Sequence, residues 1–238
     1  MTGFPRYAIY YAPARDSVLD RFGAPLLGYD AWTGETLSFP DFATQTATDW
    51  QELTQDPRKY GFHATLKAPM PLASDSTETE LLAACAAFAE KPRSIPVITP
   101  VVDAISGFIA VVPSTRSREL EQLAADCVIE LDRFRRPMTS EDRARRNPAS
   151  LTPRQREFLD RWGYPYVMAE FRFHMTLTGR LDAARRSPIQ AMLQRRFSDL
   201  GITQLAIDRI ALFRQDDARS RFRIMSQWRL CRADGGTS

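Results

Sequence analysis

The sequence contains little histidine and little cysteine, the residue types on which many metal and redox sites depend. Its 238 residues include two histidines, His63 and His174, and three cysteines, Cys85, Cys127 and Cys231. The cysteines are odd in number and widely spaced, which argues against a disulfide framework and a CxxC metal site. Zinc takes three or four ligands, and neither histidine has an ExxH or HxxxH partner. We therefore expect no metal and no cofactor.

Long apolar runs and a large excess of one charge are also missing. No stretch of about 18 apolar residues occurs, and no charged start leads into a signal-peptide run, so we expect a cytoplasmic protein without a membrane partner. The 32 basic and 29 acidic residues leave a net charge of +3. That balance does not predict a broad nucleic-acid surface, so long nucleic acid is not the expected partner. A small anionic substrate is compatible with it.

The sequence strings of several common enzyme classes are absent as well. There is no GxGxxG or GxxxxGK[ST] string, which excludes the usual nucleotide-phosphate loops. There is no GxSxG string and no thiol beside a histidine, which argues against Ser-His-Asp and Cys-His catalysis.

What the sequence does contain is one frame that occurs twice around its two histidines. Residues 62–66 and 173–177 both read Phe-His-x-Thr-Leu. A lone histidine on a strand is more often packed or exposed than catalytic, but the duplication reverses that expectation. Because histidine changes charge near neutral pH, the pair suggests one acid and one base that act on a common substrate.

Both frames alternate polar and apolar residues, as a half-buried strand does. Alternate residues of a strand share a face, so the expected polar faces are Gly61, His63, Thr65 and Lys67 in the first copy and Arg172, His174, Thr176, Thr178 and Arg180 in the second. Threonine hydroxyls can donate hydrogen bonds to phosphate oxygens, and the basic residues can add positive charge.

Periodicity and capping signals predict a mixed chain in which a strand, a helix and a strand pair occur twice. We expect strands near 6–11, 60–68, 95–105, 108–112, 205–213 and 222–230, a strand at His174, and helices near 17–27, 76–90, 115–133, 152–162 and 187–200. Residues 29–58 have no strong period and are expected to form a long connection. Arginines cluster between 133 and 161, and the interleaved acidic residues favour a solvated helical face over an anion site.

These features together resemble the 2H phosphoesterase superfamily, which carries two HxT frames in an α+β chain. The strings at 6–13, 60–69, 151–155, 171–179 and 212–215 resemble its subgroup encoded beside phosphonate-utilisation genes. The resemblance implies a single bilobal domain over 1–238, with two pseudo-symmetric lobes that each have an antiparallel sheet backed by helices. The HxT frames would meet in a cleft between the sheets. A helical insertion is expected at about 134–165 and a disordered tail at about 233–238.

The function that this resemblance implies is metal-independent hydrolysis of a small cyclic phosphate. His63 and His174 would be acid and base in either order, and Thr65 and Thr176 would bind the phosphate. The expected substrate-binding residues are Lys67, Arg172, Tyr60, Tyr10, Arg6 and Gln215. The substrate would be a small phosphorylated sugar, such as a phosphoribosyl cyclic phosphate of phosphonate catabolism, or a nucleotide. An RNA-end 2′,3′-cyclic phosphodiesterase, a 2′,5′-RNA ligase-like enzyme and a non-catalytic phosphate-ligand sensor remain alternatives, and the sequence does not indicate an oligomeric state.

Overall fold

The structure is a computed structural model that describes residues 3–233, so the tail from 234 onward lies outside the described residues. Its elements are β1 (Arg6–Tyr11), α1 (Val18–Leu27), α2 (Asp41–Thr46), α3 (Trp50–Leu53), α4 (Gln55–Arg58), β2 (Ala64–Pro71), α5 (Glu78–Glu90), β3 (Val97–Ile98), β4 (Pro100–Ile105), β5 (Phe108–Pro113), α6 (Arg118–Glu130), α7 (Ser140–Ala144), α8 (Pro153–Trp162), β6 (Met175–Thr176), α9 (Ala183–Ser198), β7 (Leu205–Ala206), β8 (Arg209–Gln215) and β9 (Arg223–Arg229).

Helices α1, α5 and α8 begin and end close to where the capping signals predict, whereas α6 is shorter than the expected 115–133 because Ser117 caps it. Ser17, Thr77 and Thr152 each accept a hydrogen bond from a backbone amide of the first turn of α1, α5 and α8, and the last two form complete capping boxes. Two differences concern weaker signals. Helix α9 begins at Ala183 because Asp182 caps it, four residues before the expected start. Residues 29–58, expected to be a connection, contain the short helices α2, α3 and α4.

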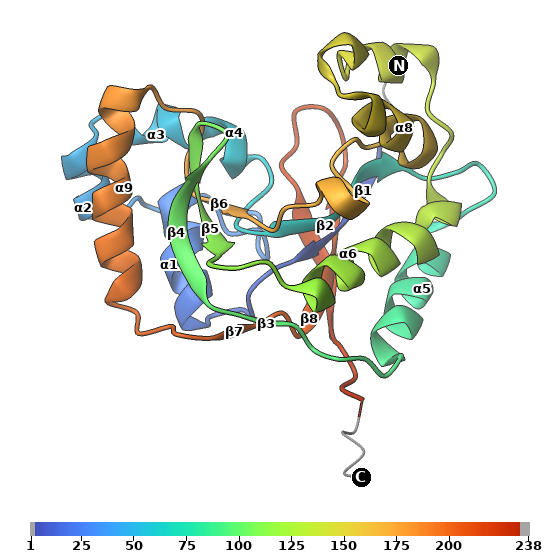
Figure 1. Cartoon of the computed structure of the whole chain (residues 1–238), viewed down its shortest axis with the longest axis horizontal. Helices are drawn as coiled ribbons and strands as arrows, with labels where there is room; N and C mark the ends of the chain where they lie inside the picture. The colour runs from blue at the N-terminus through green and yellow to red at the C-terminus, as the bar shows by residue number, and fades with distance from the viewer. Residues whose placement is uncertain (1–2, 234–238) are drawn as a thin grey trace.

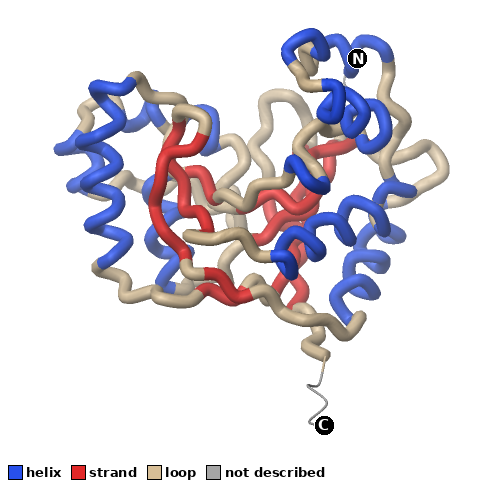
Figure 2. The backbone as a smooth tube through the Cα atoms, viewed as in Figure 1, coloured by secondary structure: helices blue, strands red, loops and turns tan. Residues whose placement is uncertain are grey.

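Within the described residues, the strands form one seven-stranded antiparallel sheet in the order β4-β5-β6-β2-β1-β8-β9, and β3 pairs with β7 separately. Figure 2 shows these strands in the middle of the molecule with helices on both outer sides. The α+β class is confirmed. The two facing sheets that we expected are instead joined edge to edge, because β2 pairs with β6 through Ala64 and Met175.

The two halves of the chain are interleaved in this sheet. Hairpin β4–β5 follows the first histidine frame in sequence but pairs with β6, which belongs to the second frame. Hairpin β8–β9 follows the second frame but pairs with β1, the neighbour of β2. The sheet thus consists of two groups of strands, β4-β5-β6 and β2-β1-β8-β9, and each group combines segments from both halves.

The helices cover the two groups of strands separately. Helix α9 packs on β4 and β5, and its Phe197 meets Phe22 of α1 at a ring distance of 5.5 Å. Helix α5 packs on β8 and β9, and α6 packs on β2. Figure 1 shows the first group with α1, α2, α3 and α9, the second with α5 and α6, and helix α8 above β1 and β2. Cys85 and Cys127 are buried on α5 and α6, as expected for small hydrophobic side chains.

Lys67 departs from the predicted face because β2 is irregular beside β1. Tyr10 pairs with Thr65 but Ile9 pairs with Lys67, so one extra residue of β2 interrupts the alternation. Lys67 is only 3% exposed, and its ammonium donates to the Asp132 carboxylate at 2.8 Å and to the Val128 carbonyl at 3.2 Å. This corrects the expectation of a substrate-facing lysine, because its charge is already paired inside the fold.

We predict that replacing Asp132 lowers the free energy of unfolding more than replacing Lys67 does. Lys67→Met leaves Asp132 paired with Arg135, which contacts the same carboxylate at 2.8 Å, so the loss should be below about 1 kcal/mol. Asp132→Asn leaves a buried ammonium without a counter-charge and should lower the free energy of unfolding by about 3 kcal/mol. Urea unfolding of both variants and of the double variant measures this difference. A larger loss in Lys67→Met than in Asp132→Asn would contradict it.

Candidate active site

The two histidine frames meet at the single residue pair that joins the two groups of strands. Ala64 of β2 lies opposite Met175 of β6 in an antiparallel register. In such a register, the neighbours of a pair also face each other, and they lie on the other side of the sheet from the pair itself. His63 is thus placed toward Thr176, and Thr65 toward His174. Each histidine of one frame lies beside the threonine of the other.

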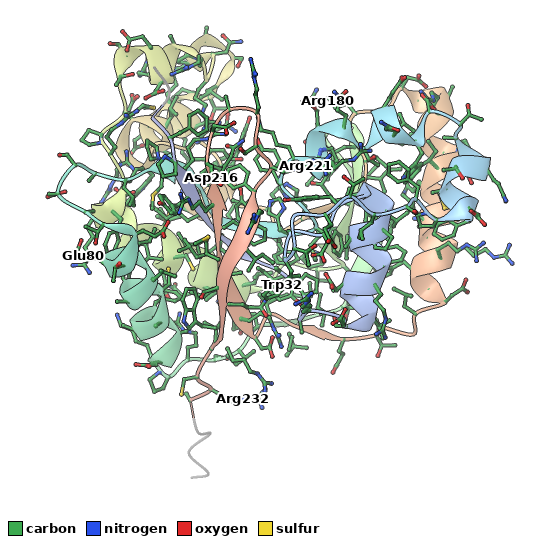
Figure 3. All side chains as sticks on the ribbon, turned by 180° about the vertical axis from the view of Figure 1, so that it is seen from behind. Trp32, Glu80, Arg180, Asp216, Arg221 and Arg232 are labelled. Carbon is green, nitrogen blue, oxygen red and sulfur yellow. The ribbon has the colours of Figure 1, made fainter. Side chains whose placement is uncertain are left out.

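A cavity of about 360 Å³ opens beside this crossing. Its lining includes Thr65 from β2, Phe108 from β5, and Arg172, His174 and Arg180 from the second frame. His63 and Thr176 are not part of that lining. In Figure 3, Arg180 lies near the top of the molecule, on the side that carries α9. The cavity is therefore bounded by strands from both groups.

Both imidazoles are held by the same backbone contact. Nδ1 of His63 lies 2.9 Å from the carbonyl oxygen of Gly61, and Nδ1 of His174 lies 2.8 Å from that of Arg172. A carbonyl can only accept, so Nδ1 carries the proton and donates, which leaves Nε2 with its lone pair. The Thr65 hydroxyl lies 3.4 Å from Nε2 of His63. Both rings therefore have the same tautomer, in which Nε2 is unprotonated.

Gly61 makes the first of these contacts possible. Its φ of +74° lies in the left-handed region, and a Cβ there would lie 2.8 Å from the Cβ of Ala31. Glycine adopts this conformation without steric cost, so the chain can turn and aim its carbonyl at His63. The second frame reaches the same contact with Arg172, which is not among the positive-φ residues.

Aromatic rings pack against both histidines, and burial lowers the basicity of both. The ring of Tyr10 stacks on His63 at a centroid distance of 3.9 Å, and Phe108 lies 5.5 Å from His174. Burial, with a smaller effect from the nearby charge of His174, lowers the pKa of His63 to about 4, although the hydrogen bond to the Gly61 carbonyl opposes the shift. Burial also lowers the pKa of His174 from its ordinary value. Both rings are therefore neutral near pH 7 in the free protein.

The residues proposed from sequence for substrate binding have different surroundings. Arg172 is exposed and lines the cavity. Tyr10 is buried under His63, and Tyr60 stacks on Phe222 at 5.2 Å and lies 6.0 Å from His63. These two tyrosines thus form a platform behind the first histidine.

Arg6 and Gln215 form a separate pair across β1 and β8. Gln215 is fully buried, accepts from Nε of Arg6 at 3.0 Å, and donates to the carbonyl of Ser220 at 2.7 Å. Its amide therefore orients Arg6 and is buried between that guanidinium and the Ser220 carbonyl. Together with Lys67, these residues lie outside the cavity lining.

Helix α8 and the segment that follows it supply cavity residues that were not among the expected site residues. They are Gln155, Tyr164, Tyr166, Val167 and Glu170. Gln155 donates to the Glu170 carboxylate at 2.9 Å, and the two tyrosine rings meet edge to face at 5.5 Å. The nearby Tyr164-Pro165-Tyr166 string just before the frame was the available signal. The expected insertion therefore contributes to one wall of the cavity.

Across residues 3–233, no group of three His, Cys, Asp or Glu side chains is arranged to hold a metal ion. None of the helices in that range has the length and apolar character needed to cross a membrane.

Comparison with known proteins assigns the chain to a family. Residues 65–223 match a family described as protein of unknown function (DUF1045), and the chain belongs to it. Two curated relatives are named ribose 1,5-bisphosphate phosphokinase PhnN. The protein of Janthinobacterium sp. (strain Marseille) is 34% identical over 89% of this chain and 48% of its own length. The protein of Laribacter hongkongensis (strain HLHK9) is 30% identical over 92% and 50%. The chain thus spans about half the length of the curated relatives it matches.

Solved structures resemble the chain at low sequence identity. E. coli LigT complexed with 3′-AMP is 12% identical, with a TM-score of 0.38 over 96% of this chain and 99% of that one. A structure described as a phosphoesterase is 15% identical, with a TM-score of 0.40 over 96% and 100%.

We predict that both histidines titrate below the ordinary value of about 6.5. Two-dimensional NMR of the imidazoles should show His63 with a pKa of about 4 and His174 with a lowered pKa. The chain has only two histidines, so spectra of His63→Ala and His174→Ala assign both signals. A pKa at or above 6.5 for either ring would contradict the packing described above.

The lowered pKa values of the histidines also make the free energy of unfolding depend on pH. A lowered pKa means that the fold favours the neutral ring, so this contribution is complete above pH 6.5 and is lost as the pH falls toward about 4 for His63. In urea unfolding, the decrease in unfolding free energy between these pH values should be smaller in His63→Ala than in wild type. An equal decrease would contradict this.

Proposed function

We propose that this protein is a metal-independent phosphodiesterase that opens a small cyclic phosphate with water. The observation that carries the proposal is the matched pair of imidazoles, each held at Nδ1 by the carbonyl two residues before it. Two rings in one tautomer, in frames that cross at Ala64 and Met175, suit an acid and a base that act on one phosphorus atom.

In this proposal the reaction follows general acid–base chemistry. Nε2 of one histidine takes a proton from water, which attacks phosphorus, and Nε2 of the other gives a proton to the leaving sugar oxygen. Thr65 and Thr176 donate hydrogen bonds to the non-bridging oxygens, where negative charge increases in the transition state. Each positioned histidine contributes a factor of about 10² to 10⁴ in rate.

The protonated acid is supplied when substrate binds. Both rings are neutral near pH 7 in the free protein because burial lowers their pKa values. A bound phosphate anion favours the charged form of a nearby imidazole and so raises its pKa. The His174 ring lines the cavity and is the better placed of the two to gain this proton.

Within this class, a phosphoribosyl cyclic phosphate is the substrate that we favour. The cavity of about 360 Å³ is suited to a small ligand. The curated relatives are named for a kinase of ribose 1,5-bisphosphate. Water attack on 5-phosphoribosyl 1,2-cyclic phosphate, with the 2-oxygen leaving, yields that bisphosphate. The proposed product is thus the compound in the relatives' name.

A nucleotide substrate is the second candidate. Tyr164 and Tyr166 lie at the cavity, and tyrosine rings can stack on a nucleobase. This would suit a 2′,3′-cyclic phosphate or a 2′,5′ linkage at an RNA end. A non-catalytic phosphate sensor would bind the same compounds without turnover.

The proposal predicts turnover that depends on both histidines and not on metal. Phosphorus NMR with EDTA should show that wild type opens 5-phosphoribosyl 1,2-cyclic phosphate to ribose 1,5-bisphosphate. His63→Ala and His174→Ala should each be slower by about 10² to 10⁴. Circular dichroism controls for folding. Preference for a nucleoside 2′,3′-cyclic phosphate would select the second candidate, and binding without turnover would select the sensor. Full activity in either variant would refute the role of that histidine.

The pH dependence of catalysis provides a separate prediction. The active form needs one neutral and one protonated histidine. As the pH increases, kcat/KM should therefore rise through about pH 4, where His63 becomes neutral, and should then decrease through the lowered pKa of His174, which is below 6.5. The profile of kcat should extend to higher pH, because bound phosphate raises the pKa of the acid. Initial rates at saturating and low substrate measure both profiles. A kcat/KM that increases up to pH 8 would contradict the assignment.

A further inference from the structure

A second cavity, of about 250 Å³, lies between the end of β2 and the α7 segment and is lined by arginines. They are Arg6, Arg135, Arg136, Arg145 and Arg146, and the acidic residue among them is Asp142. Four of these arginines come from the expected insertion and its start, and the fifth comes from β1.

The arginine cavity has more positive than negative charge. Arg135 is paired outside it with Asp132, and Asp142 is shared by Arg136 and Arg145. Among residues 3–233, Arg6 and Arg146 form no ion pair with a carboxylate.

The other neighbours of the arginines are neutral and do not compensate this excess of positive charge. Nε of Arg136 is buried without a hydrogen-bond partner. Arg6 donates to the neutral amide of Gln215, and the Arg146 guanidinium lies over the Tyr164 ring at 5.5 Å. With Arg135 left out because Asp132 neutralises it, the cavity has four guanidinium groups and one carboxylate. This is the charge balance of a site for a multiply charged anion.

The arginine cavity adjoins the cavity of the candidate active site. On β2, Ala68 lines the active-site cavity and Pro69 lines the arginine cavity. On the opposite wall, Tyr164 lines the first and Gly163 lines the second. Thr65 and Pro69 are four residues apart, or about 13 Å along a strand. Arginine side chains can cover part of that span, so one small molecule could contact both cavities.

We infer that the arginine cavity binds a phosphate monoester of the substrate, so that the enzyme selects sugars that carry a second phosphate besides the cyclic one. This inference rests on the proposed function. Guanidinium groups hold phosphate oxygens by paired charge-assisted hydrogen bonds, and a dianionic monoester matches the excess charge better than a carboxylate does. Nδ1-fixed histidines would thus perform the chemistry while arginines of the insertion select the substrate.

The binding test uses ribose 5-phosphate as the probe and Arg146→Gln as the variant. The control is Arg154→Gln, which removes the same charge from an exposed arginine that also lies 5.5 Å from an aromatic ring, that of Phe158. Calorimetry should show affinity weakened about 10-fold or more in Arg146→Gln and changed less than 2-fold in Arg154→Gln. Equal effects in both variants would overturn the inference.

The kinetic test compares 5-phosphoribosyl 1,2-cyclic phosphate with ribose 1,2-cyclic phosphate. Arg146→Gln should raise KM about 10-fold or more for the first compound and leave both constants for the second unchanged. Equal losses with the two compounds would overturn the inference.

Failure of the proposed function would be recognised separately. The double variant His63→Ala, His174→Ala should bind ribose 5-phosphate as wild type does. If neither cyclic compound is turned over but Arg146→Gln still weakens the binding of ribose 5-phosphate, the phosphate site stands and the phosphodiesterase proposal fails. If ribose 5-phosphate does not bind wild type, the phosphate site is refuted whatever the turnover.

Discussion

The pairing of Ala64 with Met175 is the contact on which the candidate site depends. It is the register pair between β2 and β6, and these strands belong to different groups of the sheet. One antiparallel pair fixes the neighbours on both strands, so a shift of either strand by one residue would turn the histidine of that strand to the opposite face of the sheet. The interleaved hairpins support this pair, because each one ties a segment from one half of the chain to a strand of the other half.

The site also resolves a conflict between burial and basicity. A buried imidazole loses solvation of its charged form, which lowers its pKa and would favour a base over an acid. The backbone carbonyls of Gly61 and Arg172 do not remove this effect, but they determine which nitrogen carries the proton. Orientation is thus encoded locally in each frame, two residues before the histidine. The protonation state is left to the environment and, in our proposal, to the substrate.

Local sequence predicted what local interactions determine. Capping residues gave the starts of α1, α5 and α8, and alternation gave buried Phe173 and Met175 beside a partly exposed His174. The exchange of hairpins between the two halves could not be predicted, because a strand's pattern does not specify its partner. Lys67 was misplaced for a related reason. An extra residue in β2 is visible only relative to the register with β1.

The arginines of the insertion show the same limit of prediction from sequence. A solvated helical face was the favoured interpretation of its arginines, and it holds for Arg143, which pairs with Asp160 on the surface. It is incomplete for Arg136, which is partly buried, and for Arg146, which is exposed, because both line a cavity with a single carboxylate. Sequence spacing gave the number of charges but not which of them share a concave surface. In our proposal, chemistry resides in the duplicated frames and selection in this unduplicated segment, so changes in the insertion would alter substrate preference without moving the histidines.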